Sequence, residues 1–204
     1  MRFLLATRSP DKLREIREIL APAAVALLSL ADAGIPASPE EEAIEAFETF
    51  RENALAKARY FAARTALPTL ADDSGLEVDA LDRAPGVYTK RFSGRTDLSG
   101  KALDLANNDL LLARLEAVPL ERRTARYVCA AAVAFPSGRS LVALGTSPGL
   151  IALHPSSGAG GFGYDPLFFV PALNATFADV PPGEKHRRSH RSRAFRALAP
   201  ELRG

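Results

Sequence analysis

The feature that most constrains the fold is a β-hairpin signal in the middle of the chain. Residues 126–135 and 140–144 are largely apolar runs, and the turn-forming residues Pro136, Ser137 and Gly138 separate them. Two such runs joined by a short turn are typical of paired neighbouring strands. Helical patterns also occur before and after the hairpin, without strict β-α-β alternation. The sequence therefore predicts an α/β or α+β fold with a mixed central sheet.

Helix signals are clearest in the first half of the chain. Ser9 and Pro10 suit the N-cap and first position of one helix, and Thr49 with Glu52 forms a capping box before another. The remaining patterns predict strands over residues 2–6, 25–30, 69–71, 76–81 and 150–153, and helices over residues 50–64, 103–115 and the C-terminal stretch.

Length and composition suit one compact domain, or two lobes that share a core. The chain has 204 residues, of which 47% are hydrophobic. It contains no run near the roughly 18 apolar residues of a membrane helix, and its N-terminus turns polar too early for a secretory signal. We therefore expect a cytoplasmic protein without a membrane partner. Cys129 is the single cysteine, which excludes an internal disulfide, and its apolar neighbours favour an inert buried thiol.

Charge is unevenly distributed along the chain. The net charge is only +2, but residues 185–196 carry many Lys and Arg side chains and no acid. Such a run attracts anions, whether nucleic acid, phosphate esters or an acidic partner. It is equally consistent with a solvated basic helix.

The loop after the first strand could bind a phosphate. A helix that begins at Pro10 offers free backbone N–H groups, and Thr7, Ser9 and Lys12 add two hydroxyls and a cation. The alternative is an ordinary capped helix.

Asp72 and Asp73 form the second candidate site, in the stretch LADDSG. We expect the DDSG residues to interrupt a strand as a turn, and in a regular strand the two carboxylates would point to opposite faces. An ionised carboxylate beside a phosphate site can bind Mg²⁺ or act as a general base toward water. An Asx-type turn is the alternative, and the acids among residues 40–48 could complete a metal shell.

Two further stretches could bind a nucleobase. Residues 158–166 contain four glycines, which let the backbone approach a flat ligand, and Phe162 and Tyr164, which could stack on a base. His190 and Arg191 could donate hydrogen bonds to a keto oxygen and so discriminate against an amino group. A hairpin turn and a basic helix start are the alternatives.

The order of these pieces resembles the inosine triphosphate pyrophosphatase family, specifically the bacterial noncanonical purine NTP pyrophosphatases. The matching stretches span almost the whole chain: LATRSPDK at 5–12, TFRENALAKA at 49–58, LADDSGLEVDAL at 70–81, PGVYTKRFSG at 85–94, GAGGFGYDPLF at 158–168, TFAD at 176–179 and EKHRRSHRSRA at 184–194.

The resemblance implies one domain over residues 1–204, with a long, mixed, twisted sheet, flanking helices and two lobes around a central substrate cleft. It also implies a homodimer that uses Mg²⁺ to hydrolyse ITP, dITP and XTP to the monophosphate and pyrophosphate. No stable nucleic-acid partner is expected.

The resemblance also assigns roles to residues. Asp73 becomes the catalytic carboxylate, and Glu45 joins it as a metal ligand. Substrate contacts fall on Thr7, Arg8, Ser9, Pro10, Asp11, Lys12, Ser74, Phe162, Gly163, Tyr164, Asp165, Lys185, His190 and Arg191.

Three residues depart from the family pattern. Arg8 and Ser9 stand where Gly or Thr and then Asn are usual, and Phe47 replaces a frequent glycine. Two other functions remain open. One is a Maf-like pyrophosphatase acting on pyrimidine or modified nucleotides, although the FGYD and SHR stretches argue against it. The other is a nucleic-acid-binding protein that uses the basic run.

Overall fold

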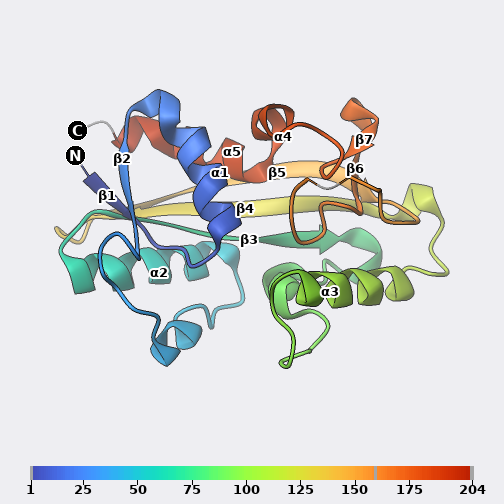
Figure 1. Ribbon diagram of the computed structural model, residues 1–204, viewed down its shortest axis with the longest axis horizontal. Helices are drawn as coiled ribbons and strands as arrows, with labels where there is room; N and C mark the ends of the chain where they lie inside the picture. The colour runs from blue at the N-terminus through green and yellow to red at the C-terminus, as the bar shows by residue number, and fades with distance from the viewer. Residues whose placement is uncertain (1, 159, 203–204) are drawn as a thin grey trace. The chain divides into compact units, whose positions relative to one another are not determined.

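The structure is a computed structural model that describes residues 2–158 and 160–202, and Ala159 of the glycine-rich stretch lies outside them. The described residues form a mixed seven-stranded sheet with the strand order β2-β1-β3-β4-β5-β6-β7 (Figure 1). The strands are β1 (Arg2–Leu5), β2 (Ala26–Ser29), β3 (Thr69–Val78), β4 (Thr124–Ala134), β5 (Ser140–Ile151), β6 (Phe168–Val170) and β7 (Ala175–Thr176). The α-helices are α1 (Pro10–Leu20), α2 (Phe50–Thr65), α3 (Gly100–Arg114), α4 (Pro182–Arg188) and α5 (His190–Leu198).

Strand pairing confirms the mixed character of the sheet. Strand β1 pairs in parallel with β2 and β3, whereas β6 pairs antiparallel with β5 and β7. The hairpin between β4 and β5 is confirmed by the N–H of Phe135, which donates to the carbonyl oxygen of Arg139 over 2.8 Å. The second hairpin strand, β5, extends to Ile151 and so includes the first residues of the predicted 150–153 stretch, whereas the short strands β6 and β7 were not predicted.

One sequence expectation about β3 is wrong. The DDSG residues do not form a turn, since β3 runs without a break from Thr69 to Val78. In the sheet, β3 lies between β1 and β4, and its place in the sheet outweighs the local turn preference of Ser and Gly. The helix starts, by contrast, are confirmed: Ser9 caps α1, and Thr49 caps α2.

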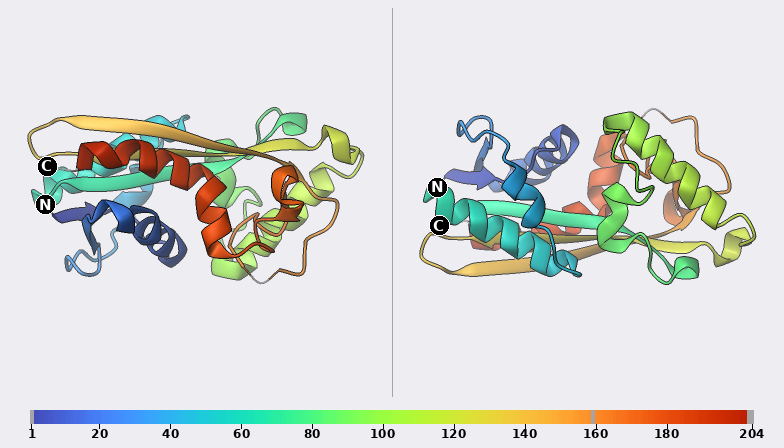
Figure 2. Two further views of the ribbon diagram at one scale, coloured as in Figure 1. Left: turned by 90° about the horizontal axis from the view of Figure 1, so that it is seen from above. Right: turned by 90° about the horizontal axis from the view of Figure 1, so that it is seen from below.

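The chain divides into two compact units. Unit 1 consists of the described residues of Met1–Ser74, Cys129–Thr146 and His190–Gly204, and unit 2 consists of Gly75–Val128 and Ser147–Ser189. In unit 1, α1 and α5 cover one face of the strands and α2 covers the other (Figures 1 and 2). Ile16 of α1 and Phe195 of α5 are fully buried in its core.

Unit 2 has its own core. Leu111 of α3 and Leu115, which directly follows the helix, pack there with Tyr127, Phe168 and Phe177. None of the described helices is both long and apolar enough to cross a membrane.

Candidate active site

Asp72 and Asp73 lie in a regular strand, so their side chains point to opposite faces of the sheet. Asp72 is completely buried, whereas Asp73 is partly accessible. The Asp73 Oδ1 atom accepts a hydrogen bond from the backbone N–H of Ser74 over 2.9 Å. The two carboxylates therefore have different surroundings, and each can serve a different purpose.

Cations surround the buried Asp72. Its Oδ2 atom lies 3.1 Å from Lys12 Nζ and 3.3 Å from Arg191 Nε. Burial alone would raise the pKa of Asp72, but the charges of Lys12, Arg191 and Lys57 hold it well below its usual range. Asp72 is therefore an ionised anchor that fixes the positions of Lys12 and Arg191.

The N-terminus of α1 carries Lys12 to this anchor. Ser9 Oγ accepts from the N–H of Lys12 over 3.3 Å, and Thr7 Oγ1 accepts from the N–H of Ser9 over 3.2 Å. Thr7 and Ser9 therefore shape the predicted phosphate loop, and each hydroxyl keeps its own proton for donation. A hollow of about 170 Å³ lies beside this loop, and Thr7, Arg8, Ser9 and Pro10 are among the residues that line it.

Two side chains of the same loop point elsewhere. The Asp11 carboxylate accepts from Arg14, one turn further along α1. The Arg8 guanidinium binds Glu41 and two backbone carbonyl groups. In this structure, any phosphate contact from these two positions would come from the backbone.

Helix α2 presents two residues toward Asp73 and Glu45. Asn53 Nδ2 donates to Asp73 Oδ2 over 3.0 Å, and Lys57 Nζ forms an ion pair with Glu45. Burial and the neighbouring Glu45 charge raise the pKa of Asp73, although Lys12 and Lys57 oppose that shift. Sequence reasoning missed Asn53 and Lys57. Their spacing of four residues within TFRENALAKA, which places both on one helix face, was the available signal.

The predicted metal ligands fit Mg²⁺ in number and kind. Mg²⁺ usually binds one or two protein carboxylates and takes its remaining ligands from substrate phosphates and water. Glu45 and Asp73 supply two carboxylates, and the charge of Glu45 is, after burial, one of the causes that raise the pKa of Asp73. No cage of three or more acidic, His or Cys side chains occurs among the described residues.

His190 and Arg191 begin α5 and are buried, with exposed fractions of 4% and 2%. The Arg191 guanidinium forms an ion pair with Glu15 and donates to Ser74 Oγ over 2.9 Å. Helix α5 lies directly against β5 because residue 145 is glycine: a Cβ atom there would come within 2.2 Å of the His190 carbonyl oxygen. The solvated-helix interpretation is therefore wrong for this part of the basic run.

In unit 2, the glycine-rich loop closes around Asp165. The Asp165 Oδ2 atom accepts from the N–H of Phe162 over 2.8 Å and from Lys185 Nζ over 2.7 Å. The Lys185 ammonium also lies 5.0 Å from the centre of the Phe162 ring. Tyr164 is only 3% exposed and donates its hydroxyl proton to the carbonyl oxygen of Thr89, so Phe162 is the more accessible of the two rings.

Helix α3 holds this loop through the backbone of Gly163. Asp104 Oδ2 accepts from the Gly163 N–H over 2.9 Å, and Asn108 Nδ2 donates to the Gly163 carbonyl oxygen over 3.2 Å. Gly161 has a φ of +72°, and a Cβ atom there would lie 2.2 Å from Asp165 Oδ2. Sequence reasoning missed Asp104 and Asn108, because no local pattern marks either one.

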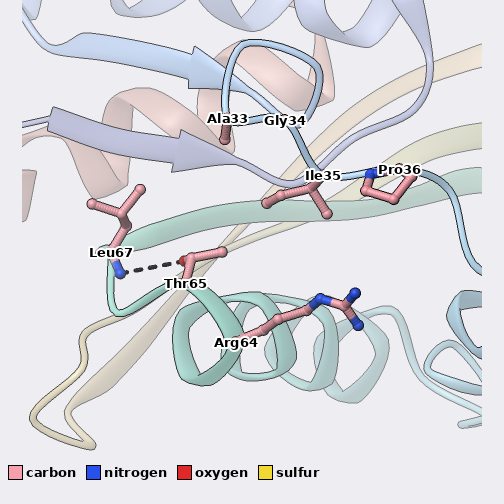
Figure 3. A pocket seen from close by; sticks show the side chains of 7 residues that line it. All are labelled: Ala33, Gly34, Ile35, Pro36, Arg64, Thr65 and Leu67. Carbon is pink, nitrogen blue, oxygen red and sulfur yellow. Dashed lines mark hydrogen bonds between the residues drawn. The ribbon is translucent and has the colours of Figure 1, made fainter.

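The predicted residues therefore form two groups, one in each unit. Unit 1 contains Thr7, Arg8, Ser9, Pro10, Asp11, Lys12, Glu45, Asp73, Ser74, His190 and Arg191, and unit 2 contains Phe162, Gly163, Tyr164, Asp165 and Lys185. A hollow of about 350 Å³ in unit 1 is lined by none of these residues (Figure 3).

Similarity to known proteins extends over nearly the full chain. The profile of the Ham1 family matches residues 3–201. A dITP/XTP pyrophosphatase from Thermus thermophilus is 48% identical, over 97% of this chain and 90% of the relative. One from Nocardia farcinica is 50% identical, over 98% of this chain and 94% of the relative. The solved structure of a HAM1 protein from Coxiella burnetii is 35% identical, with a TM-score of 0.83 over 99% of this chain and 98% of that one.

Proposed function

Because the chain belongs to the Ham1 family, we propose that it hydrolyses ITP, dITP and XTP to the nucleoside monophosphate and pyrophosphate. The observation that carries the proposal is the group of charges on and around β3, where Lys12 and Arg191 flank buried Asp72 and Asp73 remains partly accessible. Relatives of about half identical sequence carry the name of this activity. Hydrolysis would remove deaminated purines from the nucleotide pool.

The phosphate loop binds the triphosphate in this proposal. The free N–H groups at the start of α1 and the ammonium of Lys12 neutralise phosphate oxygens. Asp72 keeps Lys12 in place through the 3.1 Å ion pair. Positioning and electrostatics of this kind dominate phosphoryl chemistry.

Asp73 takes a proton from the attacking water. Water oxygen bonds to the α-phosphorus, the bond from that phosphorus to the bridging oxygen breaks, and pyrophosphate leaves with the bond's electron pair. An ionised carboxylate such as that of Asp73 can accept this proton as a general base. Asn53 holds the carboxylate by its Oδ2 atom.

Glu45 and Asp73 would hold Mg²⁺. When bound, the ion would supply neutralisation of the charge that develops on the phosphate oxygens. Lys57, which pairs with Glu45, would keep that carboxylate in place.

Base recognition is assigned to Phe162–Asp165, His190 and Arg191. The Phe162 ring offers a stacking surface, and N–H donors prefer a keto oxygen over an amino group. In this structure the Arg191 guanidinium donates hydrogen bonds to the side chains of Asp72, Glu15 and Ser74, all in unit 1. A role for Arg191 in reading the base therefore requires part of these contacts to change when substrate binds.

The proposal includes a cytoplasmic location, a homodimer and no stable nucleic-acid partner. Burial of Lys185, His190 and Arg191 removes these residues from a nucleic-acid-binding surface, which leaves only the exposed side chains Arg187, Arg188, Arg193 and Arg196 of the basic run for such contacts.

Pyrophosphate release from ITP, XTP, dITP, ATP, GTP and CTP, with and without Mg²⁺, tests this function. We expect Mg²⁺-dependent turnover of the first three far above that of the others. Turnover centred on CTP would favour the Maf-like alternative. Salt-dependent binding of oligonucleotides without any turnover would favour a nucleic-acid-binding role.

A further inference from the structure

The segment that delivers Glu45 has little regular structure of its own. Residues 30–49, here called the acidic segment, connect β2 to α2 and contain one 3-10 helix, Pro39–Ala43. Glu45 must nevertheless occupy a fixed position if it is to bind a metal ion. Side chains from outside the segment have to provide that constraint.

Arg8 makes four hydrogen bonds to the first half of the acidic segment. Its Nε atom donates to Glu41 Oε2 over 3.0 Å, and its NH2 group donates to Glu41 Oε1 over 2.6 Å. The NH1 group donates to the carbonyl oxygen of Ile35 and NH2 also donates to that of Pro36, both over 2.8 Å. One guanidinium therefore holds three points of the segment, a geometry that a lysine cannot reproduce.

The far end of the segment is held by α2. Asn53 Oδ1 accepts from the Phe47 N–H over 2.9 Å, and Asn53 Nδ2 donates to the Phe47 carbonyl oxygen over 3.1 Å. In addition, Lys57 pairs with Glu45. Arg8 and α2 thus fix the two ends of the stretch that contains Glu45.

Packing contributes less at the start of the segment. Ala33, Gly34, Ile35 and Pro36 line one side of the 350 Å³ hollow, and residues at the end of α2 line the other (Figure 3). Because the hollow leaves this side of the segment without close packing, the hydrogen bonds of Arg8 contribute more to holding the segment in place.

We propose that Arg8 is a positioning residue that ties the acidic segment to the phosphate loop. Through this tie, the position of Glu45 is fixed relative to the phosphate-binding amides of the loop. Arg8 occupies a position in the loop itself, between Thr7 and Ser9. The role of Glu45 as metal ligand rests on the proposed function. The tie made by Arg8 is a separate property.

The test compares Arg8→Met, Arg8→Lys, Glu41→Gln and the double variant Arg8→Met/Glu41→Gln with the wild type. Arg139→Met is the matched control, since Arg139 pairs with Glu201 outside the candidate site. Binding of Mn²⁺ without nucleotide, followed by electron paramagnetic resonance, measures the metal site directly. Hydrogen exchange of residues 35–45 in metal-free protein measures the tie.

We expect Arg8→Met and Glu41→Gln each to weaken Mn²⁺ binding about tenfold, which is the low end of the loss that follows removal of a residue that orients a metal ligand. The double variant should be no weaker than the weaker single one, Arg8→Lys should lie between, and exchange should accelerate within residues 35–45. The ratio of ITP to GTP turnover should stay unchanged.

Mn²⁺ affinity within twofold of wild type in Arg8→Met, with unchanged exchange, would overturn the inference. If the wild type binds Mn²⁺ in this Arg8-dependent way but does not hydrolyse ITP, the proposed function fails and the inference stands. Absence of Mn²⁺ binding by the wild type would overturn the inference, whereas the proposed function would still be decided by ITP hydrolysis.

Discussion

Around Asp72 in unit 1, charged side chains hold one another, whereas around Gly163 in unit 2, side chains hold the backbone. Lys12 and Arg191 both bind the Asp72 carboxylate. Asp104 and Asn108 instead bind the N–H and carbonyl groups of Gly163. The arrangement around Asp72 therefore depends on which side chains carry charge, and the arrangement around Gly163 depends on the path of the main chain.

This difference predicts which substitutions each region tolerates. Replacing a carboxylate by an amide keeps the shape of the side chain and removes its charge, so such a change should cause a large loss of activity or stability in unit 1. Adding one methyl group to a glycine keeps the charge and changes the backbone, so it should be severe in the glycine-rich loop.

Asp73→Asn should have the largest effect on activity. Loss of the general base is expected to lower kcat for ITP about 10³-fold, while circular dichroism and the unfolding midpoint stay close to wild type. Steady-state kinetics measures the loss, and Asp97→Asn is the control because Asp97 pairs with Arg95 outside both groups. Near-normal kcat in Asp73→Asn would remove this residue from the chemical step.

Asp72→Asn should have the largest effect on stability. An amide removes the buried charge that balances Lys12 and leaves Arg191 with Glu15 as its remaining partner, so the free energy of unfolding should fall by about 3 kcal/mol. Urea denaturation at neutral pH measures the change, with the exposed pair of Asp32 and Arg17 as a comparison through Asp32→Asn. A loss no greater than that of Asp32→Asn would contradict the ionised-anchor assignment.

Gly161→Ala tests the backbone side of the comparison. The new Cβ atom would lie 2.2 Å from Asp165 Oδ2, and the alanine would also have to adopt a positive φ. We expect KM for ITP to rise about tenfold, equivalent to about 1.4 kcal/mol of lost binding, with a smaller change in kcat. In Gly138→Ala the added atom has open space, so strain of about 1 kcal/mol should lower stability without changing KM.

The smallest effect concerns Cys129. Burial and the Asp72 charge raise the pKa of its thiol well above the usual range. A thiol reagent should therefore react with the native protein far more slowly than with protein unfolded in guanidinium chloride, as absorbance of the released chromophore would show. Rapid reaction of the native protein would mean that the core around Asp72 opens readily.

Local signals predicted the parts of the fold whose partners are close in sequence. Ser9, Pro10 and Thr49 mark helix starts, and their contacts lie within three residues. The turn expected at Asp72 and Asp73 was wrong because strand pairing is a tertiary effect that the local pattern does not contain.

Contacts between distant residues account for what could not be predicted. Arg191 and Asp72 are 119 positions apart, so burial of His190 and Arg191 within the basic run was not visible from its composition. Asn108 lies 55 positions from Gly163, and Arg8 lies 33 from Glu41. The motifs did predict the aspartates, the glycine-rich loop and the capped phosphate loop as candidates, but not the side chains that hold them.

Hydrolysis of ITP in water enriched in heavy oxygen tests the central claim most directly. The account predicts that the wild type, with Mg²⁺, releases IMP and pyrophosphate with the heavy oxygen in IMP, and that Asp73→Asn releases almost none. Heavy oxygen in pyrophosphate, or release of IDP with labelled inorganic phosphate, would contradict attack at the α-phosphorus by water that Asp73 activates.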